Sequence, residues 1–153
     1  MVSKIKHNQK TLYDTDYHLW LEETVKQLQA KNFSSLDWEN LIEEIVSLGR
    51  SEKRRIESLL TRLFEHLLKL ACWEQERDYN QNHWKREIRN FRKQINKELK
   101  TSPSLKPYLE RIFEECYQDS RELVADISQL PLDTFPLSPI GNPEQVLDEN
   151  WLP

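Results

Sequence analysis

RSEKRRIESLLTRLFEHLLKLACW, residues 50–73, is the stretch that decides the fold. Its apolar residues recur at the three- and four-residue spacing of one helix face: Ile56, Leu59, Leu60, Leu63, Phe64, Leu67, Leu68, Leu70 and Ala71. At roughly 100° per residue they cover about half of the helix circumference. A surface helix needs a narrower stripe. We therefore expect this segment to be the central helix of a helical bundle, with neighbours on two sides.

The composition favours a single all-α domain. A chain of 153 residues is long enough for one domain with its own core. Five Trp, five Tyr and five Phe, together with many Leu and Ile, argue against disorder. The two Gly and seven Pro fall at candidate boundaries, which is typical of an all-α protein.

Apolar periodicity and capping residues predict four helices besides the central one. We expect them over residues 13–31, 36–48, 83–100 and 104–128. Asp37 caps the second helix, and Gly49 is expected to end it in a turn before the central helix, rather than in a kink. A polar connection is expected over 74–82, and Ser104 is expected to cap the last of these helices.

The predicted organisation has three parts. Residues 1–12 are polar and basic and form a flexible N-terminal segment. An antiparallel bundle of about five helices covers residues 13–130. Residues 131–153 are Pro-rich, and their apolar side chains suggest a strap packed over the bundle. Asn142-Pro143 can start a short helix in this strap that continues to Leu147.

The N-terminal sequence and the cysteines favour a cytoplasmic protein. MVSKIKHNQK has no apolar core of the kind found in secretory signal peptides. No apolar run approaches the roughly 20 residues that span a bilayer, so no membrane contact is expected. Cys72 and Cys116 lie in helical apolar patterns and are interpreted as buried thiols in a reducing compartment.

Charge is unevenly distributed along the chain, which carries a net charge of −4. Residues 50–100 contain 14 Lys or Arg against 8 Asp or Glu, a net charge of +6; the remainder contains 8 against 18, a net charge of −10. Such asymmetry can indicate an anionic partner. It can equally indicate two parts of the chain that neutralise each other.

Several stretches together resemble one known family. They are YDTDYHLW (13–20), NLIEEIVSLGRSEKRRIESLL (40–60), RLFEHLLKL (62–70), SPSLKPYL (102–109) and PEQVLDENWLP (143–153). They are similar to DUF29, a family of unknown function that is abundant in cyanobacteria. The resemblance covers about residues 13–153 and implies an all-helical fold. It implies no catalytic residue. The chain departs from the family at RDYNQNHW (77–84), where members often have an Arg-Ser-x-Ser-Trp-like stretch.

Glu44 and His66 lie at the margins of two predicted apolar faces. A carboxylate and an imidazole that meet there could form an acid–base pair. The alternative is a structural polar contact that fixes helix register, with Glu44 paired to Arg54, His66 or Arg86. We favour the structural interpretation. A metal site is not expected, because the sequence lacks the two Glu-x-x-His helices of a di-metal bundle.

Arg77 and His83 fit an Arg-polar-x(3–5)-His pattern that resembles HEPN-type ribonucleases. In that hypothesis Arg77 would stabilise charge on the scissile phosphate and His83 would be the acid or base. The spacing is loose, and such pairs occur often by chance. No phosphate loop, Cys-x-x-Cys pair or nucleophile elbow is present, so no cofactor is expected.

A basic arc lies opposite the apolar stripe of predicted helix 83–100. Its members are Lys85, Arg86, Arg89, Arg92, Lys93, Lys97 and Lys100, and the start of the central helix adds Arg50, Lys53 and Arg54. Such an arc could bind phosphates. It is also what any amphipathic helix presents to solvent. Trp84 and Phe91 belong to the apolar stripe, so the arc offers no aromatic side chain for base stacking.

The leading functional hypothesis is a non-enzymatic interaction or adaptor module that binds a protein partner or forms a homodimer. The first alternative is a nucleic-acid-binding module that uses the basic face of residues 85–100. The second alternative is a metal-independent ribonuclease that uses Arg77 and His83.

Overall fold

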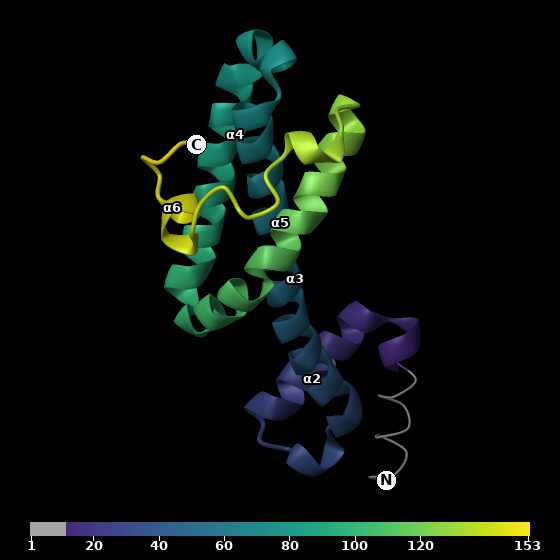
Figure 1. Cartoon of the computed structure of the whole chain (residues 1–153). Coiled ribbons are helices and arrows are strands. Elements are labelled where there is room, and N and C mark those ends of the chain that lie inside the picture. Colours follow the sequence, from purple (N-terminus) through teal and green to yellow (C-terminus); the bar gives the residue numbers. More distant parts are fainter. Residues whose placement is uncertain (1–11) are drawn as a thin grey trace. The chain divides into compact units, whose positions relative to one another are not determined.

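Residues 12–153 are described by a computed structural model, and their regular secondary structure is entirely helical (Figure 1). The all-α class predicted from periodicity is therefore confirmed. Contacts within the chain group it into two compact units, the first ending at Ser51 and the second covering Glu52–Pro153. The predicted domain limits near residues 12 and 130 stay predictions.

Unit 1 contains α2 (Tyr17–Gln29), the short 3₁₀ helix η1 (Phe33–Ser35) and the first part of α3. The predicted helix over 13–31 is interrupted: residues 12–15 are helical, and Asp16 separates them from α2. The Asp16 carboxylate accepts a hydrogen bond from the Leu19 amide at 3.0 Å. A side chain that caps in this way competes with continuation of the helix through its own position.

The predicted turn at Gly49 is wrong. Helix α3 runs without interruption over Trp38–Cys72, so the second predicted helix and the central helix are one element. Asp37 starts it, accepting a hydrogen bond from the Asn40 amide at 3.4 Å. A Gly that ends a helix usually adopts a positive φ, and Gly49 does not. A helical Gly costs only about 1 kcal/mol relative to Ala, which the surrounding helix formers outweigh.

The polar connection predicted over 74–82 is also wrong. Helix α4 covers Glu74–Thr101, and Trp73 alone separates it from α3. Arg77 of α4 reaches back to the end of α3, donating from Nε to Leu70 O at 2.9 Å and from Nη2 to Ala71 O at 2.8 Å. These bonds satisfy carbonyl groups that a helix end leaves without partners, so no longer loop is needed.

Helix α5 covers Lys106–Ser128 and follows the 3₁₀ helix η2 (Pro103–Leu105). Ser104 therefore lies within η2 and is not the N-cap of α5. The end of α5 agrees with the prediction. Gln129 terminates it in the left-handed conformation with φ of 60°.

The core of unit 2 forms among the second part of α3, α4 and α5. Figure 1 shows α4 folding back along this part of α3, with α5 beside them. Eight of the nine apolar residues predicted for the central helix are buried, and Ala71 is half-buried. Phe64 packs edge-on against Phe113 at 4.9 Å and Tyr117 at 5.3 Å between ring centroids. The central role predicted for residues 56–71 is confirmed in unit 2.

The tail of unit 2 crosses α5 and α4 as a strap (Figure 1). It contains η3 (Leu132–Thr134) and α6 (Pro143–Leu147), whose capping box joins Asn142 and Gln145. Phe135 and Val146 are buried in the core. The Tyr117 hydroxyl donates to Pro136 O at 2.5 Å. The short helix predicted after Asn142 is confirmed.

Candidate interaction sites

Arg77 and His83 lie on different sides of α4. The Arg77 guanidinium donates to the two carbonyl oxygens at the end of α3. His83 is exposed on α4. Six residues of helix place the two side chains roughly 120° apart around α4 and about 9 Å apart along it. A catalytic role for this pair stays a prediction.

Glu44 receives hydrogen bonds from two tyrosines. Tyr13 and Tyr17 each donate a phenol hydroxyl to its carboxylate at 2.5 Å. These bonds lower the pKa of Glu44, and the same contact raises the pKa of Tyr13 to about 12. The partners proposed from sequence, Arg54, His66 and Arg86, are not the ones it uses. Tyr13 and Tyr17, four positions apart in the helix predicted over residues 13–31, were the available signal, because such residues would share a helix face.

His66 is buried in unit 2, where it contacts residues of α3 and α4. Its Nδ1 lies 2.8 Å from Arg62 O, so this nitrogen donates the proton. The ring packs against Phe91 at 5.3 Å between centroids. Burial lowers the pKa of His66 and favours the neutral imidazole. The expected meeting of Glu44 with His66 required a turn at Gly49, which the continuous helix does not make.

Arg92 does not belong to the exposed basic arc, so the prediction is wrong for this residue. Its side chain is 1% exposed, and its Nε donates to Val146 O of the strap at 2.7 Å. Asn96, one turn further along α4, donates to Leu147 O at 3.2 Å. Desolvation lowers the pKa of Arg92. A long side chain opposite the core stripe becomes buried here because the tail folds over it.

Two of the three cations at the start of the central helix already contact groups of this chain. Arg50 pairs with Glu43 at 3.3 Å, and the Lys53 ammonium lies 5.3 Å from the centre of the Tyr108 ring. Arg54 is exposed. On α4, Lys85 is half-buried and donates to Gln81 at 3.4 Å.

No group of three or more metal-ligating side chains occurs in the part of the chain that the structure describes.

A second group of α4 cations stays exposed. We call Arg86, Arg89, Lys93, Lys97 and Lys100 the basic stripe. At about 100° per residue they fall within an arc of roughly 80°. The stripe therefore forms one continuous line of positive charge along α4.

The apolar side chains of unit 1 are largely uncovered. The open apolar face comprises Tyr17, Leu21, Val25 and Leu28 of α2 and Trp38, Ile42, Ile45 and Val46 of α3. Each of these side chains is at least about one-third exposed, and Ile45 reaches 61%. In the described part of unit 1, Trp20 and Leu36 are the buried large hydrophobic residues. Of the face predicted for residues 38–48, Leu41 is half-buried and the other apolar side chains are exposed, so the described residues of unit 1 leave most of it uncovered.

The apolar residues of the open apolar face form one stripe on each helix. At about 100° per residue, the four residues of α2 span an arc of roughly 80° and the four residues of α3 an arc of roughly 100°. Tyr13 and Tyr17 join the start of α2 to Glu44 of α3, so the two helices are in contact near that residue.

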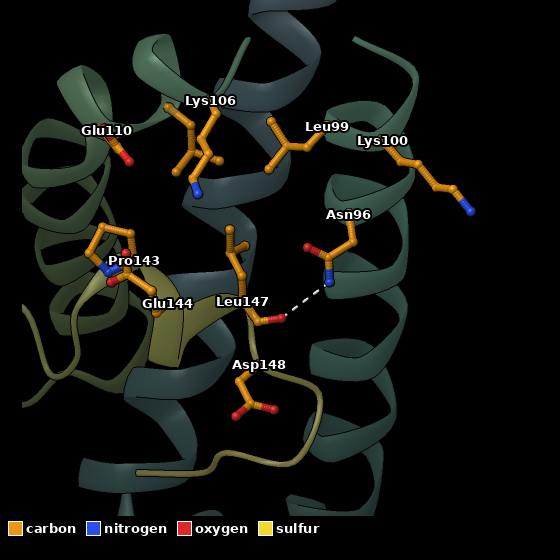
Figure 2. Close-up of a pocket in the computed structure, with 10 residues that line it drawn as sticks. Asn96, Leu99, Lys100, Lys106, Glu110, Pro143, Glu144, Leu147 and Asp148 are labelled. Carbon is orange, nitrogen blue, oxygen red and sulfur yellow. Dashed lines mark hydrogen bonds between the residues drawn. The ribbon is translucent and has the colours of Figure 1, made fainter. Parts of the chain in front are cut away.

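A pocket of about 420 Å³ lies in unit 2 where α4, the start of α5 and α6 converge (Figure 2). Leu99, Leu109 and Leu147 line it, and Asn96 hydrogen-bonds Leu147 O at its side. Its volume suits a small molecule. The charged side chains around it have both signs and are exposed: Lys100, Lys106, Glu110, Glu144 and Asp148. These charges do not point to one kind of ligand. We therefore interpret the pocket as the place where α6 of the strap packs against α4 and α5.

Between residues 12 and 153, no helix combines the length and the apolar character needed to cross a lipid bilayer.

No curated protein and no solved structure matches the chain. One family model does match, described as a domain of unknown function, DUF29, and it covers residues 12–152. That match spans nearly the whole chain, which therefore belongs to the DUF29 family.

Proposed function

We propose that this protein is a self-associating interaction module, in which the open apolar face of unit 1 binds the same face of a second copy. The observation that carries the proposal is the exposure of eight large apolar side chains, four in a stripe on α2 and four in a stripe on α3. Exposed apolar surface of this extent usually marks an interface.

The size of the face suits a dimer. Eight side chains of roughly 150–200 Å² each, exposed by about half, amount to on the order of 700 Å² per copy. A stable interface buries about 800 Å² on each partner. Burial of this face in a dimer would also stabilise unit 1. A helical pair with so few buried apolar residues is too small to be stable alone.

A second copy is the partner that the geometry favours. Two helix pairs that join through their apolar stripes form a four-helix assembly, which is a common way to bury such surfaces. A twofold axis requires one self-complementary patch, and this chain supplies it. Glu22, Glu39 and Glu43 lie off the apolar stripes. Dimer formation would therefore not bury an unpaired carboxylate.

Other occupants have weaker support. Residues 1–11 contain Met1, Val2 and Ile5 as their apolar residues, too few to match the face. The eight acids of residues 12–51 against three Lys or Arg give a net charge of −5 around the face, which does not favour nucleic acid. A cytoplasmic location and an adaptor role towards other proteins stay predictions.

Sedimentation velocity of the full chain across a wide range of concentration tests the proposal. We expect the mass of two 18.5 kDa chains. The double variant Ile42→Glu, Ile45→Glu should sediment as a monomer, because two carboxylates would be buried in the interface without partners. Both side chains are exposed, so the isolated chain should keep its helical circular dichroism.

Leu19→Glu is the matched control. Leu19 is an exposed apolar residue of α2 on the opposite side from the open face. This variant should dimerise like the parent chain. A parent chain that is monomeric at every concentration overturns the proposal. So does a dimer that survives the double substitution, because it would use another surface.

A further inference from the structure

One arc of the outer face of α4 carries no acidic residue over seven turns. Within roughly 80° it presents Gln75, Tyr79, Asn82 and the five cations of the basic stripe. Glu87 and Glu98 lie well outside this arc, and Asp78 lies about 20° beyond its edge. A solvated helix face normally mixes both signs of charge. Within the arc, the side chains are cations and neutral hydrogen-bonding groups.

The basic stripe also lacks partners within the chain. Among the described residues, no ion pair, side-chain hydrogen bond or ring contact involves the side chain of any of its five cations. Other cations of unit 2 are used. Arg55 pairs with Glu98 at 3.3 Å, and Lys69 pairs with Glu65 at 2.9 Å. The stripe is therefore available to an external anion.

Tyr79 adds an exposed aromatic ring to the same line. It is 87% exposed, the highest value among the large hydrophobic residues described. Tyr79, Arg86, Lys93 and Lys100 are each seven residues apart, so they align along α4. The sequence-based prediction placed residue 79 in a connecting loop, and the absence of an aromatic side chain from the basic face followed from that error.

We propose that this face of α4 binds single-stranded nucleic acid, with phosphates on the basic stripe and a base stacked on Tyr79. Cations that track the backbone, combined with an aromatic platform, are the features that single-strand-binding surfaces share. Tyr79 to Lys100 spans about 31 Å of helix, enough for several nucleotides. This site is independent of the self-association proposed above.

An exposed ring distinguishes the proposed ligand from other polyanions. The bases of a duplex are already stacked, and an acidic polypeptide has no obligatory planar group to place on Tyr79. The whole chain carries −4, so attraction must be local to the stripe. At about 0.1 M salt, charges beyond roughly 10 Å are largely screened, which permits such local binding.

Fluorescence anisotropy of labelled oligo(dT) and oligo(U) with the full chain tests the proposal, with a duplex of equal length and poly-glutamate as competitors. We expect binding at low salt that weakens as salt rises, and preference for the single strands. Arg89→Ala with Lys93→Ala should flatten the log–log salt dependence by about 1.4, because each single-strand phosphate contact contributes about 0.7.

Tyr79→Ala should weaken single-strand binding about tenfold and leave the salt dependence unchanged, because stacking is not ionic. Tyr79→Phe should keep the affinity of the parent chain. Lys31→Ala removes one exposed cation of unit 1 and is the control for loss of positive charge outside the stripe; it should have no effect on binding. All these side chains are exposed, so circular dichroism should confirm intact folding.

Three outcomes overturn the proposal. The first is no binding of any single strand at low salt. The second is equal affinity for the parent chain and the Arg89→Ala, Lys93→Ala variant. The third is competition by poly-glutamate as strong as by oligo(dT) together with no effect of Tyr79→Ala, which would make the stripe a site for acidic polypeptide.

Discussion

Glu44 shows how one residue acquires its role from an unexpected partner. Its carboxylate lies at the edge of α3, where sequence reasoning offered only cations and an imidazole as partners. The phenols of Tyr13 and Tyr17 take that place at 2.5 Å. Tyr13 also contacts Trp20, with ring centroids 4.9 Å apart. The cluster connects the start of the described chain to α3.

Glu44→Gln should lower the pKa of Tyr13 and of Tyr17. The Glu44 carboxylate raises the pKa of Tyr13 to about 12 and also raises that of Tyr17, because a phenolate would lose the hydrogen bond and face a negative charge. The neutral amide removes that repulsion. A spectrophotometric titration of phenolate should therefore show two tyrosines ionising at lower pH than in the parent chain.

The sign of the stability effect follows from the same contact. The folded pKa of Tyr13 lies above its unfolded value of 10, so the stabilisation is present below pH 10 and is lost as pH rises towards about 12. The folded pKa of Glu44 lies below its ordinary 4.5, so its stabilisation is present above that pH and is lost on acidification. Glu52→Gln, which removes an exposed carboxylate that acts on neither tyrosine, is the control, and an unchanged titration in Glu44→Gln would contradict the prediction.

Arg92 and Arg89 show that the polarity of a residue does not determine whether its side chain is buried. Both are arginines on the side of α4 away from the core stripe. One is buried beneath the strap with its Nε on Val146 O, and the other stays exposed. The difference depends on a tail that lies 54 positions later in the chain. No local pattern carries that information.

At the scale of elements, α3 is the main departure from expectation. Its apolar register continues through Gly49: Trp38, Ile42 and Ile45 lead to the same helix face as Ile56 and Leu60. The periodicity was therefore compatible with one helix. A Gly followed by a polar run is equally compatible with a helix end, and the two conformations differ locally by only about 1 kcal/mol.

Gly49→Ala tests the continuous helix. We expect the free energy of unfolding to rise by about 0.5–1 kcal/mol, because Ala loses less backbone entropy in a helix and its Cβ would meet nothing within 4 Å. Urea denaturation followed by circular dichroism measures the change. The Ile42→Glu, Ile45→Glu background removes any contribution from association.

Gly141→Ala is the matched control for this substitution. A Cβ at Gly141 would lie 2.9 Å from Trp151 Cη2, so the same change should destabilise the strap. The expected effects therefore have opposite signs. Destabilisation by Gly49→Ala would instead support a turn with positive φ at that residue.

At the scale of the whole molecule, the two units differ in what they bury. Every member of the main hydrophobic cluster lies between Ile56 and Val146, in unit 2. In the described part of unit 1, eleven large hydrophobic side chains are exposed, and eight of them belong to the open apolar face. Unit 2 has a core sufficient for a domain, whereas unit 1 has a surface that calls for a partner.

The fragment 52–153 should fold alone. We expect it to keep a helical spectrum and to unfold cooperatively in urea, because the cluster that it contains is complete. The fragment 12–51 should instead gain helicity as its concentration rises, since its stability depends on association. A fragment 52–153 without cooperative unfolding would show that unit 2 needs residues of unit 1.

The sequence by itself determined the all-α class, the central core of residues 56–71 and the short helix after Asn142. These features depend on the spacing of neighbouring residues, which a linear pattern records. The tertiary structure decided the course of α3 through Gly49, the burial of Arg92, the exposure of the open apolar face and the position of Tyr79 on α4. At Gly49 the local free-energy difference is only about 1 kcal/mol, and the sequence around Arg92 does not distinguish it from the exposed Arg89. Contacts between residues far apart in the chain therefore determine the outcome.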